Sequence, residues 1–172
     1  MKRAHFTQIL AVILFIAALM TPLAAQTQAE GTAQTDTDIK YKDARYGFCF
    51  SLPESWSGYS VVTDHWDGSN NSGPQGYQVV EHGPIIVIRH PLWTKENPRQ
   101  NIPIMVFTHE QWEALQKDDF HIGAAPIGPE ELGRNKKYVF ALPARYNFAY
   151  LTGFEEVDKI VHGKSLHAPC RP

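Results

Sequence analysis

Apolar and polar residues alternate along several short stretches of the chain. The clearest is residues 46–52, in which aromatic and aliphatic side chains occupy every second position. Strict alternation is typical of a half-buried β-strand. Residues 39–43 alternate in the same way, and we expect the two strands to pair as a hairpin across Ala44 and Arg45. Further strands are predicted at residues 58–64, 77–82, 85–90, 120–124 and 137–142.

Small and rigid residues set the predicted turns. Residues 65–76 are rich in Gly, Asn, Ser and Asp, which favour a surface loop. Gly83 and Pro84 separate two apolar stretches, a pattern that predicts a hairpin turn. Residues 129–132 predict a short turn of helix, and residues 144–151 fit either a strand or a helix.

Two apolar runs, residues 85–88 and 104–107, have no polar face. Strands of this kind must be covered on both sides, and we expect helices to cover them. The sequence therefore predicts an α+β fold: one twisted, mostly antiparallel sheet with helices on both faces.

Two helices are predicted from the residues that would begin them. Thr108 and Gln111 have the spacing of a capping box, in which each side chain bonds the backbone N–H of the other residue. Thr152 and Glu155 show the same spacing before a second apolar stripe. Gly163 suits the end of that second helix.

An aromatic–glycine–aromatic strand followed by a proline and a tryptophan occurs as Tyr46-Gly47-Phe48-Cys49-Phe50-Ser51-Leu52-Pro53 with Trp56. This motif resembles the opening strand of the PsbP-like fold family, and the resemblance implies an α/β/α sandwich. Residues 83–151 are also similar to a group of uncharacterised exported bacterial proteins. The PsbP-like family covers many roles, so the resemblance implies a fold and assigns no functional residue.

The N-terminus has the three parts of a secretory signal peptide in the right order. Lys2 and Arg3 precede an apolar run at residues 9–20, and small residues follow it. We expect cleavage after Ala25, with Ala29 as the second candidate. The alternative is an uncleaved anchor, but the run is shorter than the ~20 residues that span a bilayer.

The predicted organisation has three parts. Residues 1–25 are the signal peptide, residues 26–38 form a flexible polar tether, and residues 39–172 form a single domain. We therefore expect a secreted or periplasmic protein with no membrane span in its mature chain.

The charge balance bears on the choice of partner. The chain has 16 Lys and Arg against 18 Asp and Glu, and its only basic cluster lies next to two glutamates. Nucleic-acid binding needs a clustered basic face, so the sequence argues against it. The partner we expect is another envelope or extracellular protein.

Two cysteines, Cys49 and Cys170, are the only ones in the chain. In an oxidising compartment they permit one disulfide. Two free thiols are the alternative that the sequence leaves open.

No motif in the sequence specifies a chemistry. The Gly-x-Ser-x-Gly spacing of a serine hydrolase is missing from residues 68–73. His109 and Glu110 lack the second histidine of a zinc-protease helix, and residues 64–71 lack the glycine and glutamate of a calcium loop. We expect no cofactor and assign no catalytic or metal-binding residue.

One stretch has the composition of a contact surface. Arg89, His90 and Trp93 precede a proline-rich loop that ends at Pro103, and Arg and Trp are favoured in interfaces. The alternative is that Trp93 has a purely structural role and covers a sheet edge. We expect an exported binding or accessory domain, more readily than an enzyme. The alternative is a small hydrolase or metal-dependent enzyme with a dispersed site.

Overall fold

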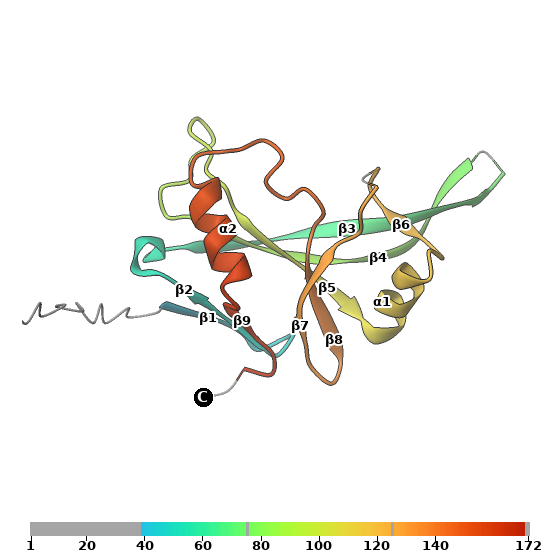
Figure 1. Ribbon diagram of the computed structural model, residues 1–172, viewed down its shortest axis with the longest axis horizontal. Helices are drawn as coiled ribbons and strands as arrows, with labels where there is room; N and C mark the ends of the chain where they lie inside the picture. The colour runs from blue at the N-terminus through green and yellow to red at the C-terminus, as the bar shows by residue number, and fades with distance from the viewer. Residues whose placement is uncertain (1–38, 75, 125, 171–172) are drawn as a thin grey trace, which may run out of the picture. The chain divides into compact units, whose positions relative to one another are not determined.

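The fold is built from two antiparallel sheets (Figure 1). A computed structural model describes residues 39–170 apart from residues 75 and 125. The larger sheet is a six-stranded half-barrel of order β6-β3-β4-β5-β8-β7, and the smaller has order β1-β2-β9. The strands are β1 (Ile39–Asp43), β2 (Phe48–Leu52), β3 (Ser60–Gly73), β4 (Gly76–Arg89), β5 (Ile102–Thr108), β6 (His121–Ile122), β7 (Glu130–Arg134), β8 (Tyr138–Leu142) and β9 (Leu166–His167).

The long β3–β4 hairpin replaces two features that the sequence predicted. β3 continues to Gly73, through most of the predicted loop of residues 65–76, and β4 runs straight through the predicted turn at Gly83 and Pro84. The predicted turn was wrong for a physical reason. A side chain at Gly83 would start 2.5 Å from the indole of Trp66, so glycine is needed there for close packing. Pro84 is tolerated because β5 begins to pair with β4 only at Ile85.

The predicted α/β/α sandwich is also wrong, because the protein is mostly β. One face of the half-barrel packs on the small sheet and on α2 (Phe154–His162), and the other packs on α1 (His109–Gln116). The prediction that both faces are buried is confirmed for residues 104–107 of β5, whereas Ile85 and Val87 of β4 are only partly buried. The apolar runs could not show that a second sheet, in place of a helix, does most of the covering on one side.

Side chains alternate between the two faces along β4 and β5. Ile86, Ile88, Ile104 and Val106 enter the core between the sheets. Met105 and Phe107 enter the smaller core under α1, where Trp66, Trp112, Leu115 and Phe120 also lie. The two faces therefore hold two separate apolar cores.

Both predicted helices are present, but only the first begins as predicted. Thr108 and Gln111 form the expected capping box, with Gln111 N donating to Thr108 Oγ1 over 3.1 Å. The second predicted box is wrong, because the residue that caps α2 is Gly153, which has a left-handed φ of 86° and no side chain to form a cap. Gly163 does end α2. The predicted helical turn at residues 129–132 is instead part of β7, and residues 144–151 form a series of turns.

The disulfide prediction is confirmed, because Cys49 and Cys170 are bonded. Cys49 lies opposite His167 in the β2–β9 ladder, and Cys170 N–H donates to Gly47 O. The bond therefore fixes the C-terminal segment against the small sheet.

Some predictions fall on parts of the chain that the structure does not describe. The signal peptide of residues 1–25, its cleavage after Ala25 and the tether of residues 26–38 lie outside the described residues. Within residues 39–170, no helix is long and apolar enough to cross a membrane.

Candidate binding groove

The three residues of the predicted contact surface separate in the structure. Arg89 and Trp93 meet, with the guanidinium carbon 4.2 Å from the centre of the indole ring, a favourable cation–π geometry. His90, the first residue after β4, instead packs into the core between the sheets. It is buried edge-on against Trp56, with ring centres 5.1 Å apart.

His90 has the environment of a core residue. Its Nδ1 accepts a hydrogen bond from Leu92 N–H over 3.1 Å. Burial, and then the nearby charge of Arg99, lower the pKa of His90 from its usual 6.5. The imidazole is therefore held neutral and supports the β4–β5 connection.

A surface groove of about 510 Å³ lies beside Arg89. Its floor is the face of the half-barrel that α1 leaves uncovered. Val62 pairs with Val87, and Val87 pairs with Pro103, so an apolar row crosses three strands. The loop after β8 forms the wall and contributes Tyr146, Phe148, Ala149 and Leu151.

The strand register gives the groove a polar end. Arg89 and Asn101 each lie two residues beyond the apolar row, and the strands are antiparallel, so both lie at the same end. Asp64 lies at the opposite end, because it is two residues beyond Val62 on β3. Asp64 pairs with Ile85, four residues from Arg89. At about 3.3 Å per residue, its position is roughly 13 Å along the strands from Arg89. A cationic end and an acidic end therefore bracket an apolar floor.

The polar end holds hydrogen-bonding groups that the described residues leave unused. Gln100 is only 5% exposed. Its Nε2 donates to Tyr146 O and Asn101 O over 3.0 and 3.2 Å. Its Oε1, Asn101 Oδ1 and Arg89 Nε have no partner among the described residues. Buried polar groups in native proteins are rarely left unpaired, because each costs about 1–3 kcal/mol.

The wall of the groove has an unusual backbone. Arg145 and Tyr150 have φ of 56° and 46°, a left-handed conformation that costs a non-glycine residue free energy and gathers at functional sites. Between them, the ring of Phe148 is 75% exposed. Because Tyr146 O is bonded to Gln100, the loop is anchored to the polar end of the groove.

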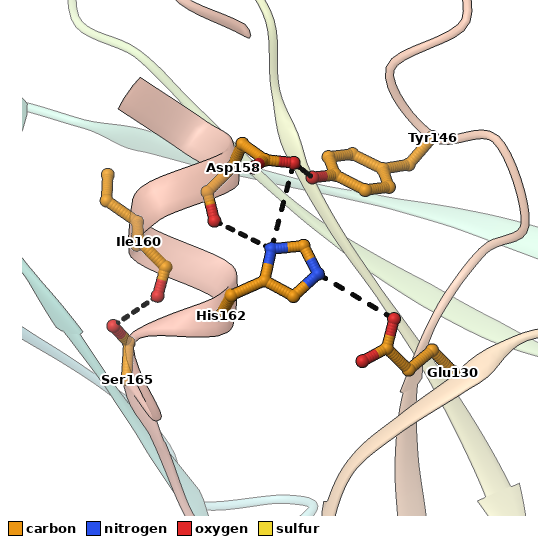
Figure 2. Close-up of polar contacts among 6 residues, drawn as sticks. All are labelled: Glu130, Tyr146, Asp158, Ile160, His162 and Ser165. Atoms are coloured by element: carbon orange, nitrogen blue, oxygen red, sulfur yellow. Dashed lines mark hydrogen bonds and ion pairs between the residues drawn. The ribbon is translucent and has the colours of Figure 1, made fainter. Parts of the chain in front are cut away.

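A second cluster anchors the same loop to α2 (Figure 2). Tyr146 OH donates to Asp158 Oδ1 over 2.8 Å. Figure 2 shows His162 between Asp158 and Glu130, whose Oε2 lies 3.7 Å from His162 Nε2. Burial and the bond to Asp158 raise the pKa of Tyr146 above its usual value. The phenol therefore stays a donor.

Tyr146 of this cluster lines the groove beside Arg89. The side chains of Glu130, Asp158 and His162 are about half exposed, and they line none of the four hollows described around Ser51, Gly83, Arg89 and Gly47. Catalysis needs a site that holds a substrate against the reacting group. The cluster connects α2, β7 and the loop that forms the groove wall, and it therefore fixes their relative positions.

A serine and a histidine also meet, on the small sheet. Ser51 Oγ lies 3.5 Å from His167 Nε2, beside a hollow of about 580 Å³. A serine hydrolase also needs a group that orients the histidine and donors that stabilise the oxyanion. Within the described residues, His167 Nδ1 has no such partner among the hydrogen bonds and ion pairs found. This pair does not amount to a catalytic site.

The described part of the chain was expected to offer a metal site only if several ligand side chains gathered at one place. No three His, Cys, Asp or Glu side chains gather there closely enough to hold an ion. Three of the five buried polar side-chain atoms without a partner among the described residues belong to residues that line the groove beside Arg89.

Sequence reasoning found Arg89 but missed most of the groove. Gln100, Asn101 and Phe148 carry no motif, and Val62 meets Val87 only through the strand pairing. The predicted turn at Gly83 hid that pairing, because it assigned β4 to two strands. The one feature of the sequence that could have indicated the polar end of the groove was the cluster of polar residues just before the apolar run of β5.

Comparison with models of protein families, with curated proteins and with solved structures found no match to this chain. The resemblance to the PsbP-like family therefore gains no support from relatives, and the mostly-β architecture does not have the sandwich that it implied.

Proposed function

We propose that this chain is an exported binding domain whose groove beside Arg89 holds a small amphipathic carboxylate. The supporting observation is the polar end of the groove, where Arg89, Gln100 and Asn101 offer a guanidinium and unpaired polar atoms next to an apolar floor. Small-molecule sites have this composition: mostly apolar walls with a few polar groups that fix orientation.

The positions of Arg89 and Asp64 at opposite ends of the groove set the orientation of the ligand. An arginine fork matches the two oxygens of a carboxylate, and the described residues place no ion-paired acid on Arg89. The carboxylate would therefore lie at Arg89, and the apolar body would cross Val62, Val87 and Pro103 beneath Phe148. Asp64 at the far end would repel a second anionic group.

Export is the other half of the proposal. A disulfide between Cys49 and Cys170 is consistent with an extracytoplasmic protein. We infer that the chain is secreted or periplasmic and that its leader is cleaved after Ala25. A protein partner in that compartment remains part of the same proposal.

Calorimetric titration with three probes tests the groove. Octanoate has the carboxylate and the apolar chain, acetate lacks the chain, and octanol lacks the charge. We expect measurable binding of octanoate alone. Arg89→Gln should weaken it by about 10–100-fold, because a hydrogen bond to a charged group is worth about 1.5–3 kcal/mol.

Arg45→Gln is the matched control, since Arg45 also stacks on an aromatic ring, that of Tyr46 at 5.5 Å, but lies away from the groove. It should leave octanoate binding unchanged. Equal loss in both variants, or equal binding of octanoate and octanol, would contradict the proposal.

A further inference from the structure

The groove beside Arg89 ends in a carboxylate that octanoate would leave without a partner. Asp64 lines the groove at the end away from Arg89. The methyl end of octanoate offers this carboxylate neither a hydrogen bond nor a charge, and it displaces part of the water that solvates the carboxylate. A positive group at that end of a ligand would pair with Asp64 instead. The acidic end of the groove therefore bears on the class of ligand.

The strand register places Asp64 and Arg89 on the same face of the sheet. Val62 pairs with Val87, and side chains two residues apart on a strand share a face. Asp64 therefore shares the face of Val62, and Arg89 shares the face of Val87. Both charged residues lie at the ends of one apolar floor, in agreement with their common place in the lining of the groove.

The described contacts of Asp64 leave it able to take a further partner. Its Oδ1 accepts a hydrogen bond from His65 N–H over 2.8 Å and lies 3.5 Å from His65 Nδ1. That ring is charged only when it is protonated, and its Nε2 lies 3.7 Å from Asp67. Among the described residues, no Lys or Arg forms an ion pair with Asp64. The acidic end of the groove therefore has no permanent cation beside it in this part of the chain.

We infer that the groove holds an ω-amino carboxylate, a ligand with a carboxylate at one end of an apolar chain and an ammonium group at the other. This inference rests on the proposed function and narrows the class of ligand at the same site. The carboxylate binds Arg89, and the ammonium group donates to Asp64. Between them the apolar chain lies on Val62, Val87 and Pro103. An ammonium group has three donors, so it can bond Asp64 and still hydrogen-bond water at this open end.

The spacing of the two charges sets the length of the ligand. Asp64 and Arg89 lie roughly 13 Å apart along the strands, and Arg89 extends toward Trp93, which follows β4. An extended chain advances about 3.3–3.6 Å for every three bonds. The eight bonds from the carboxyl carbon to the nitrogen of 8-aminooctanoate therefore span roughly 10 Å. A hydrogen bond of about 2.8 Å at each end brings this ligand to the length that the two residues require.

Calorimetric titration of the wild type and of Asp64→Asn with three eight-carbon ligands tests this inference. Octanoate ends in a methyl group, 8-aminooctanoate in an ammonium group and octanedioate in a second carboxylate. Asparagine keeps an oxygen for the bond from His65 N–H but removes the charge. Titration at pH 8, where histidine side chains are ordinarily uncharged, keeps a competing cation away from Asp64.

We expect Asp64→Asn to weaken 8-aminooctanoate relative to octanoate by about two- to fivefold, the range that an exposed ion pair gives. The same change should strengthen octanedioate relative to octanoate, because it removes a like charge. Both effects should shrink as salt is added. Asp67→Asn is the matched control, since Asp67 lies three residues along β3 on the opposite face, is 49% exposed and does not line the groove. It should leave the order of the three affinities as in the wild type.

The outcomes separate this inference from the function on which it rests. If octanoate binds but Asp64→Asn changes all three affinities by the same factor, the ligand has no ammonium group at Asp64, and the inference is wrong while the carboxylate groove stands. Equal effects of Asp64→Asn and Asp67→Asn would also overturn it, since only Asp64 lines the groove. If none of the three ligands binds, the proposed function fails and this inference fails with it.

Discussion

Replacing Gly83 by alanine tests the pairing that defines the hairpin. The new Cβ would lie 2.5 Å from the ring of Trp66, so either the strands separate or the indole moves. Overpacking of a core costs about 1–3 kcal/mol. Displacing Trp66 also risks its 3.1 Å bond to Val106 O, worth about 1 kcal/mol, and its stacking on Phe107, worth about 0.5–1.5 kcal/mol.

One effect opposes this loss. Alanine restricts the unfolded chain more than glycine and stabilises by about 0.4–1 kcal/mol where the backbone allows it. The clash should outweigh that gain, because Trp66 is almost fully buried and its neighbours are rigid rings. We therefore expect Gly83→Ala to lower the free energy of unfolding by about 1–3 kcal/mol.

Urea unfolding, followed by tryptophan fluorescence with the disulfide intact, measures the effect. Gly128→Ala is the matched control, since no described atom comes within 4 Å of its Cβ position and its φ is outside the left-handed region; it should be neutral or stabilising. If Gly83→Ala proved as stable as Gly128→Ala, Trp66 could not lie over Gly83, and β4 would not run through this position as a strand.

Two further predictions concern stability. Cys170→Ser removes the disulfide but keeps the buried Cys49 in place; with a separation of 121 residues, the loop-entropy model gives a loss of up to about 5 kcal/mol. A urea midpoint equal to that of the oxidised wild type would contradict it. Burial holds the pKa of His90 below 6.5 in the folded protein, so its contribution is full above pH 6.5 and is lost as the pH falls, because the unfolded chain binds the proton first. His90→Gln should flatten this part of the stability–pH curve, and an unchanged slope would refute the assignment.

The sequence predicted the strands that alternate or are wholly apolar, because those patterns follow directly from burial on one or two faces. β1, β2, β5 and β8 were placed within about two residues. The capping box at Thr108 was also recognisable, since it depends on residues three apart. These features are local, and local features can be read from the order of residues.

The errors came from tertiary packing that the order of residues does not contain. Gly83 looks like a turn residue, but it is glycine because Trp66 lies across it. The small sheet covers the core where helices were expected, since apolar runs report burial without naming the covering element. The groove was missed for the same reason: Val62, Val87 and Gln100 meet only through strand register and loop packing.

The most direct test of the proposed function is a nitrogen–proton correlation spectrum that resolves the Arg89 Nε–H and the Gln100 side-chain amide, recorded as octanoate is added. We expect saturable shifts of these two signals and of the Phe148 backbone amide, because all three groups belong to residues that line the groove. Signals of Ser51 and His167, in the hollow on the small sheet, should stay in place. Shifts confined to that hollow, or a spectrum unchanged by octanoate, would contradict a binding groove at Arg89.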